Sequence, residues 1–482
     1  MNFLSHILTA TRTRATGFFA GCCLAAIVLA AQAAETPADV AIAGVVGGLV
    51  KTGEPGCTVA VGRNGALAHA LAFGLADVER GKPLDTHSVF NLASVSKQFT
   101  AFALLLLEQQ GRLSLDDALV KHVPELSASA KGVTLRHLMH HTGGLRDYIG
   151  LLTMGGRGAA DGATIHEAVQ ALARQTRPNE QPGVEYEYSN TGYFLLGVVI
   201  ARVSGQSLAG FSEAQIFRPL GMKNTSIVDR YPDGIAALAR GYANTGKGFV
   251  IDETGWEQVG DGQVHSDLHD LVLWDDNFHT GKLGGRELIA EMTKLGVLNS
   301  GGRIEYAAGL RVATTRGLPS VSHGGSWVGY RSQMLRFPDE RLSVIVLCNR
   351  DDADSGALAS AVAGVFLGGK MGPPDRGEEE PAAVPEPAGP PWQPGDLARF
   401  AGTYASAEAN AQCRLYLRDG ALVAEGCAAG AVLKPGKPGQ FTDTDESFSL
   451  TFPDDGAGTD GFSYDTFGLR GLPFARVKEP FE

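Results

Sequence analysis

The chain has 482 residues, of which 44% are hydrophobic and 20% charged, and its formal net charge is −12. This composition is ordinary for a folded globular protein and excludes wholesale disorder. The length predicts two or three domains. An acidic chain without a basic stripe also argues against a nucleic-acid partner.

The first 33 residues have the pattern of an export signal. Two arginines precede an apolar run over 17–31, and residues 31–33 (Ala-Gln-Ala) form a small-x-small cleavage site. We therefore expect a signal peptide at 1–33 and a periplasmic or secreted product. Two alternatives stay open: an uncleaved anchor, although the run is short for a membrane span, and a lipoprotein with an imperfect lipobox before Cys22.

Export leaves four cysteines in a compartment that permits disulfide bonds. Cys413 and Cys427 flank two strand-like runs joined near Asp419-Gly420, which is a hairpin turn signal. We therefore predict that these two cysteines form a disulfide. Cys57 and Cys348 lie in apolar strand-like runs, where buried, unreactive thiols are expected.

The first quarter of the chain predicts two helices around a β-hairpin with an Asn-Gly turn. These elements are a helix at 37–52, strands at 57–62 and 66–74, and a helix at 94–110 that ends at Gly111.

The middle of the chain, to about residue 290, is mainly helical with Gly-rich loops. Strand patterns return at 306–312, 330–337 and 342–349, and a last helix follows at 355–367. Strands at both ends of this region predict one antiparallel sheet flanked by helices, with an inserted all-helical region, which is an α/β (α+β) fold. An active site would lie in the cleft between the two.

A linker and a second folded unit follow. Residues 373–394 contain eight prolines and a run of three glutamates, which predicts a solvated, semi-stiff linker at 371–395. Residues 396–482 carry short runs rich in Tyr, Phe, Leu and Val between Gly and Asp turns, which predict a small all-β, barrel-like domain. The main domain would then span 34–370.

The first candidate catalytic motif is Ser94-Val-Ser-Lys97, at the start of the helix predicted over 94–110. A serine and a lysine three residues apart share one helix face, and backbone N–H groups are free at a helix start. A neutral lysine there can take the serine proton. The alternative for this short motif alone is a serine N-cap beside a solvated lysine.

Two further segments carry chemistry. Tyr188 and Asn190 precede an apolar helix and offer a phenol and an amide to one cleft, where a phenol can relay a proton; the alternative is a tyrosine that packs the helix entry. His323-Gly-Gly-Ser326 stands before the strand predicted at 330–337. Its glycines would let a substrate backbone approach the sheet edge, and the alternative is a glycine turn.

Together and in this order, the three segments resemble the motifs of the serine β-lactamase and penicillin-binding protein superfamily. The resemblance is closest to the branch with class C β-lactamases, D-alanyl-D-alanine carboxypeptidases, D-aminopeptidases and related esterases, which is peptidase S12-like. It covers roughly residues 40–365. Framing segments at 135–145, 181–190 and 262–271 also match, and residues 397–404 and 468–476 are similar to barrel modules appended to D-aminopeptidase-like members.

The resemblance implies roles for the reacting groups. Ser94 would be the acylated nucleophile, and Lys97 and Tyr188 would share the general-base and general-acid work. Which of the two holds the proton stays open. The backbone N–H groups of Ser94 and Ser326 would form the oxyanion hole.

The resemblance also implies substrate contacts: Asn190 would position the substrate, and His323, Gly325 and Ser326 would line it. Class C β-lactamases typically have Lys-Thr-Gly where this chain has His323-Gly-Gly, so a permanent cation has become a residue that titrates near pH ~6.5. This change weakens binding of a carboxylate beside the scissile bond. We therefore rank peptide, amide and ester hydrolysis above β-lactam hydrolysis.

Two histidine groups raise metal binding as an alternative. His137, His140 and His141 lie at helical spacing, as do His265 and His269, and such pairs can bind zinc. Neither run has the His-Glu-x-x-His form, and both lie in framing segments of the family. We therefore expect no metal and no cofactor.

The resulting expectation is an exported serine hydrolase that acts through a covalent acyl-enzyme, with a D-amino-acid-containing peptide as the leading substrate. The alternatives are a β-lactamase or short-chain esterase of the same family, and a non-catalytic cell-wall-binding or regulatory protein that kept the fold. The expected partner is a small peptide, amide or ester, cell-wall peptides included, with no nucleic acid and no membrane span once the signal is removed.

Overall fold

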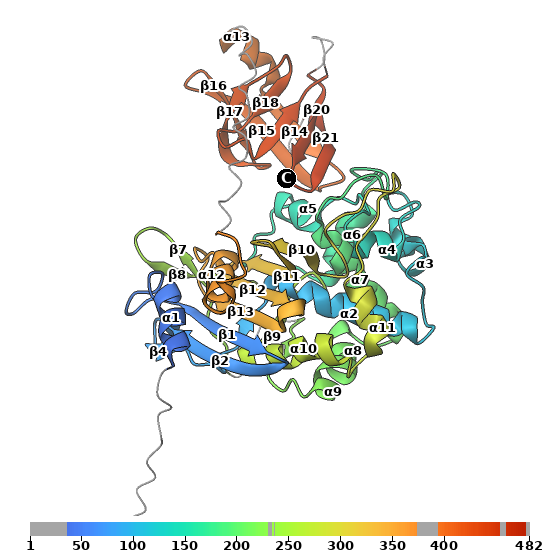
Figure 1. Cartoon of the computed structure of the whole chain (residues 1–482). Coiled ribbons are helices and arrows are strands. Elements are labelled where there is room, and N and C mark those ends of the chain that lie inside the picture. The colour runs from blue at the N-terminus through green and yellow to red at the C-terminus, as the bar shows by residue number, and fades with distance from the viewer. Residues whose placement is uncertain (1–35, 230–233, 236, 374–393, 454–458, 479–482) are drawn as a thin grey trace, which may run out of the picture.

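The computed structural model describes residues 36–229, 234–235, 237–373, 394–453 and 459–478. The predicted signal peptide and most of the predicted linker lie outside the described residues. Figure 1 shows two parts, an N-terminal part (residues 36–373) built on a sheet and helices, and a barrel above it.

A six-stranded antiparallel sheet forms the centre of the N-terminal part, in the order β10-β11-β12-β13-β1-β2. The strands come from both ends of this part, as predicted. They are β1 (Cys57–Arg63), β2 (Ala66–Phe73), β10 (Arg311–Thr315), β11 (Leu318–Trp327), β12 (Tyr330–Phe337) and β13 (Leu342–Cys348). Asn64 and Gly65 join β1 to β2 at φ values of 53° and 80°, the combination that a type I′ hairpin turn requires.

The late strands differ from the prediction in two places. The strand expected from residue 306 begins only at Arg311, because the chain turns at Gly309 (φ 69°) and Ala307 N–H donates to Leu310 O at 2.7 Å. Strand β11 was not predicted, since its two glycines favour a turn. Gly325 nevertheless pairs with Ser332 of β12, so the His-Gly-Gly-Ser motif lies inside a strand and not before one.

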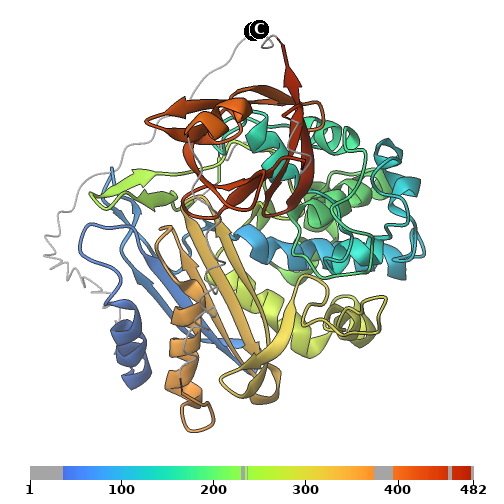
Figure 2. The same ribbon diagram turned by 90° about the horizontal axis from the view of Figure 1, so that it is seen from above.

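One face of the sheet is covered by two helices that lie side by side, α1 (Pro37–Val46) and α12 (Ser355–Leu367) (Figure 2). Alternate residues of the central strands, such as Val59 and Val344, pack against them in one buried apolar cluster. A capping box between Thr36 and Asp39 satisfies the backbone N–H groups at the start of α1.

The other face packs on α10 (Leu268–Thr280). Beyond it, α2 (Lys97–Gln109) runs through the core, because it is buried on all sides from Lys97 to Leu107. Helix α7 (Asn190–Ser204) packs along α2, so the first residues of both helices meet in the same region.

The remaining elements of this part are short. Helices are α3 (Leu119–His122), α4 (Leu135–Met139), α5 (Tyr148–Met154), α6 (Ile165–Ala173), α8 (Leu208–Ser212), α9 (Arg218–Leu220) and α11 (Gly285–Met292). Short strands are β3 (Leu75–Asp77), β4 (Lys82–Pro83), β5 (Phe90–Asn91), β6 (Ser226–Ile227), β7 (Tyr242–Asn244), β8 (Phe249–Ile251) and β9 (Val264–Ser266). Within the described residues no single helix has the length and apolar character to cross a membrane; only the bent pair Asn190–Ser204 and Leu208–Leu220 does so jointly, by length and composition alone.

Eight antiparallel strands close into the predicted C-terminal barrel, preceded by α13 (Pro394–Leu397). Aromatic rings such as Phe400, Tyr404, Phe452 and Phe462 pack together in its interior. The strands are β14 (Gly402–Ser406), β15 (Ala411–Arg418), β16 (Ala421–Glu425), β17 (Ala429–Pro435), β18 (Gln440–Thr442), β19 (Phe448–Thr451), β20 (Gly461–Thr466) and β21 (Leu469–Val477).

Two disulfides cross-link the part of the chain that the structure describes. The bond between Cys413 and Cys427 staples one hairpin of the barrel, as predicted. Cys57 and Cys348 are bonded as well, so the expectation of two free buried thiols was wrong. These residues stand directly opposite each other in β1 and β13, and their sequence separation of 291 hid the pairing from any local pattern.

The barrel docks on the N-terminal part above α5 (Figure 1) through a buried charge. Arg146 is fully buried and forms an ion pair with Glu408, which lies between β14 and β15. Its second amino group donates to the carbonyl oxygens of Arg470 and Gly471 at 3.1 Å each. A buried guanidinium that binds barrel groups through both of its amino nitrogens fixes the orientation of the two parts.

Candidate active site

Ser94 lies in the short 3₁₀ turn η1 (Ala93–Ser96) directly before α2. Ala93 has φ 47°, which is uncommon for a residue with a Cβ atom, and Asn91 Oδ1 accepts its N–H at 2.8 Å. The turn leaves Ser94 on the wall of a cavity of about 740 Å³, while the residues on both sides of it are buried.

Lys97 is fully buried one turn further on, and its amine reaches three oxygen atoms. Nζ lies 3.1 Å from Ser94 Oγ, 2.8 Å from Asn190 Oδ1 and 2.9 Å from the carbonyl oxygen of Asp261. These acceptors match the three donors of an ammonium group. A neutral amine held in the same place would accept the Ser94 proton.

Tyr188 completes the cluster. Its ring centroid lies 4.9 Å from Lys97 Nζ, and its side chain lines the same cavity as Ser94 and Asn190. The structure thus brings together four residues that the sequence analysis singled out, from η1, α2, the loop before α7 and the first turn of α7.

His323 is held as a neutral imidazole. Its Nδ1 lies 2.6 Å from Gly324 O, a carbonyl that can only accept, so the proton sits on Nδ1; Nε2 then accepts from the Tyr306 hydroxyl at 2.8 Å. Burial, reinforced by the charge of Lys97, lowers the pKa of His323 to about 4. The third motif therefore carries no positive charge at neutral pH.

Gly325 explains how β11 comes so close to the nucleophile turn. A Cβ atom at this position would lie 2.3 Å from both Leu92 O and Ser332 Oγ, so any side chain would push the strand away from η1. The close approach places Ser326 on the cavity wall together with Ser94. The two residues to which the family resemblance assigns the oxyanion hole thus line one cavity.

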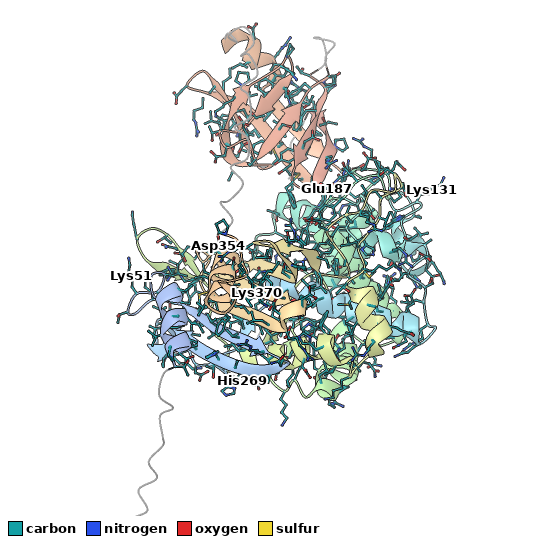
Figure 3. All side chains as sticks on the ribbon, in the orientation of Figure 1. Lys51, Lys131, Glu187, His269, Asp354 and Lys370 are labelled. Carbon is teal, nitrogen blue, oxygen red and sulfur yellow. A yellow bond between two sulfur atoms is a disulfide. The ribbon has the colours of Figure 1, made fainter. Side chains whose placement is uncertain are left out.

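The cavity has aromatic walls. The rings of Tyr148 and Trp256 lie 6.2 Å apart, and Trp327 is 5.8 Å from Trp256. The barrel adds Phe467, which is 69% exposed and lines the same space. Figure 3 shows Asp354, another wall residue, on the side of the N-terminal part that faces the barrel.

Two buried carboxyl groups belong to this region, and one of them, that of Asp261, is on a residue that lines the cavity. Asp261 accepts a hydrogen bond from the Tyr148 hydroxyl at 2.9 Å, and burial raises its pKa. Burial, with a contribution from the Asp261 charge, raises the pKa of Asp147 to about 6. Asp261 therefore binds the Lys97 amine through its backbone oxygen and the Tyr148 hydroxyl through its side chain.

Sequence reasoning missed several residues of this site. Tyr306, Asp261 and Phe467 belong to no recognisable local motif, and their contacts depend on residues far away in the sequence. The segment at 262–271 matches the family, and it begins directly after Asp261, so this match was the one signal that could have found Asp261.

The histidines weighed as metal ligands lie in other surroundings. His141 packs against Tyr188, and His265 is buried in β9, whereas His269 stacks on His87. Across the residues that the structure describes, no group of three or more His, Cys, Asp or Glu side chains is arranged to hold a metal ion.

Comparison with known proteins decides the family. The family model described as Beta-lactamase matches residues 35–365. This chain belongs to the β-lactamase family. The resemblance inferred from the three motifs is confirmed, and the chain is a serine hydrolase related to β-lactamases and penicillin-binding proteins.

Individual relatives agree with this assignment. Penicillin-binding protein 4* of Bacillus subtilis (strain 168) is 32% identical over 345 residues, covering 66% of this chain and 74% of that protein. A D-aminopeptidase of Cereibacter sphaeroides (strain ATCC 17023) is 29% identical over 318 residues, which cover 65% of this chain but only 60% of the D-aminopeptidase. The penicillin-binding protein homologue from Pyrococcus abyssi, an octamer, shares the fold with a TM-score of 0.59 and 22% identity, over 88% of this chain and 96% of that one.

Proposed function

We propose that this hydrolase cleaves amide or ester bonds of small D-amino-acid-containing peptides through a covalent acyl-enzyme on Ser94. The observation that carries the proposal is the 3.1 Å contact between Lys97 Nζ and Ser94 Oγ at the wall of an open cavity. A hydroxyl with a basic partner within hydrogen-bond reach is the arrangement that nucleophilic catalysis needs.

Acylation follows from this geometry. Ser94 Oγ attacks the substrate carbonyl carbon while its proton passes to the base shared by Lys97 and Tyr188, and a C–O bond forms as the carbonyl becomes an oxyanion. The Ser94 and Ser326 N–H groups stabilise that oxyanion, by about 3–4 kcal/mol per donor. When the tetrahedral intermediate collapses, the C–N or C–O bond to the leaving group breaks and the leaving group takes the proton from the same pair. Water then hydrolyses the ester by the reverse proton route.

The neutral third motif supports the choice of substrate. His323 donates to Gly324 O and accepts from Tyr306, so no permanent cation stands at the position where a carboxylate beside the scissile bond would bind. Arg331 also lines the cavity, but its charge is partly offset by the nearby carboxylates of Asp252 and Asp351. Amides and esters without that carboxylate, such as D-amino-acid amides and aminopeptidase substrates, therefore suit the site better than β-lactams.

The aromatic walls support an apolar substrate side chain. Trp256, Trp327 and Phe467 surround space that a bulky group can fill, and each large apolar side chain buried there contributes about 1.5–3 kcal/mol. We expect D-phenylalanine derivatives to be hydrolysed better than D-alanine derivatives of the same leaving group.

A labelling experiment tests the catalytic proposal. The purified protein should react with a fluorophosphonate probe or a labelled penicillin, and mass spectrometry should find the adduct on Ser94. S94A should fold normally and lose turnover, and K97A should lose several orders of magnitude because groups that act as a unit fail together. If no acylating probe labels the wild-type protein, the alternative of a non-catalytic wall-binding protein is favoured.

We further propose export and a separate C-terminal domain. The predicted signal at 1–33 would be removed to give a periplasmic or secreted protein with a main domain at 34–370, a linker at 371–395 and a barrel domain at 396–482. Mass spectrometry of the mature N-terminus tests export, and a chain that begins at Met1 would contradict it.

A further inference from the structure

His141 holds the chain on both sides of Tyr188. Its carbonyl oxygen accepts the N–H of Glu187 at 2.9 Å, and its side-chain Nδ1 accepts the N–H of Ser189 at 3.0 Å. Its ring also lies against the ring of Tyr188, with centroids 4.4 Å apart. A single residue therefore fixes the backbone before and after Tyr188 and one face of its side chain.

The backbone conformation of His141 is energetically unfavourable, which indicates that the surrounding structure imposes it. The residue is 1% exposed and has φ 58°, a region that few residues other than glycine adopt. Because Nδ1 accepts a backbone N–H, the ring proton sits on Nε2, and that buried atom has no hydrogen-bond partner among the described residues. An aliphatic side chain could fill this space without an unpaired donor, so filling space does not account for an imidazole here.

We propose that His141 is the positioning residue for Tyr188: it sets the distance of the phenol from Lys97 and Ser94 by fixing the Glu187–Ser189 segment. The inference rests on the proposed function, since it assigns His141 a task within that reaction. This role needs two properties of residue 141: a hydrogen-bond acceptor at the δ position of the side chain, and a backbone that tolerates positive φ.

Asparagine offers both of these parts without the ring. Its Oδ1 stands at the same number of bonds from Cα as Nδ1 of histidine, and asparagine is among the few residues enriched at positive φ. Glycine tolerates the backbone but offers no acceptor, and glutamine carries the same amide one methylene further out. The series H141N, H141G and H141Q therefore separates the acceptor from the backbone conformation and from the ring.

The neighbouring His140 provides a matched control. It is also buried, but its side chain packs against Gly296, and it is not among the described rings that contact Tyr188. H140N removes a buried imidazole of the same size next to the same turn. It should leave kcat within about 3-fold of the wild-type value.

The experiment measures kcat and KM for a D-amino-acid amide or an activated ester, with thermal unfolding of each variant. We expect H141G to lower kcat about 100-fold with KM within 3-fold, since a displacement of about 1 Å in a reacting group costs this much. H141N should recover kcat to within 10-fold of the wild type, and H141Q should not. If H141G does not fold, the comparison of H141N with H141Q decides.

Two results would overturn the inference. One is an H141G enzyme that folds and keeps kcat within 3-fold. The other is an equal loss in H141N and H141Q, which would mean that the δ acceptor plays no part. Neither result resembles failure of the proposed function, in which the wild-type protein itself shows no turnover and no acylation of Ser94.

Discussion

Removing the charge of Glu408 should destabilise the protein more than removing any exposed carboxylate. The Arg146 side chain is 0% exposed and that of Glu408 is 10% exposed, and the arginine has no route to solvent once its partner is neutral. Leaving a buried charge without its counter-ion costs about 3–5 kcal/mol. E408Q keeps the shape of the side chain, so the loss reports on the charge and not on a cavity.

Urea unfolding of E408Q at pH 7, followed by tryptophan fluorescence, measures this loss. The matched control is E125Q, since Glu125 pairs with Arg202 at the surface, with side chains 35% and 37% exposed. Exposed pairs contribute about 0–1 kcal/mol, so E125Q should change stability by less than 1 kcal/mol. Equal, small losses in both variants would refute the reasoning, because the barrel contact would then be no stronger than a surface ion pair.

Three other predictions follow from particular contacts. G325A should lower the rate at which an acylating probe labels Ser94 at least 100-fold, because its Cβ would overlap two oxygen atoms. The control G369A, with no atom within 4 Å of the added Cβ, should be labelled at the wild-type rate. Burial lowers the pKa of His265 to about 4, so His265 is protonated in the unfolded protein at a higher pH than in the folded one, and the free energy of unfolding falls as pH drops from 6.5 towards 4. H265N should therefore remove roughly 2 kcal/mol of the stability loss that urea titrations show between pH 7 and 5. An unchanged pH dependence would contradict this assignment. F467A should raise KM for D-phenylalanine amide about 10-fold and raise it less for D-alanine amide, as the loss of one buried aromatic contact implies; equal effects on both amides would exclude the ring from the substrate pocket.

The catalytic cluster was accessible from the sequence because its strongest signals are local. Ser94 and Lys97 are three residues apart, and Tyr188 and Asn190 are two apart, so each pair is placed by one turn of backbone. The order of the motifs along the chain then pointed to the family. The sheet and the inserted helical region were predicted separately, from strand patterns at both ends of the main domain.

The rest of the site depends on tertiary contacts that no periodic pattern in the sequence reveals. Tyr306 reaches His323 only because the chain turns back before β10, and the two glycines of β11 concealed a strand. Cys57 and Cys348 looked like separate core residues because strand register, which pairs them, is set by the assembled sheet. Phe467 comes from a different part of the chain, and only the docking of the barrel brings it to the cavity.

The position of β1 in the sheet has a consequence for how the molecule is made. Its hydrogen-bonding partners are β2, which follows at once, and β13, whose Cys348 is synthesised 291 residues after Cys57. Until then the backbone N–H and C=O groups along one edge of the first hairpin have no partner strand. A chain synthesised from its amino end exposes that edge until β13 is made, and the edge can meanwhile pair with another copy. The disulfide between Cys57 in β1 and Cys348 in β13 ends this exposure, because it can form only after β13 has been made and it then keeps the two strands paired.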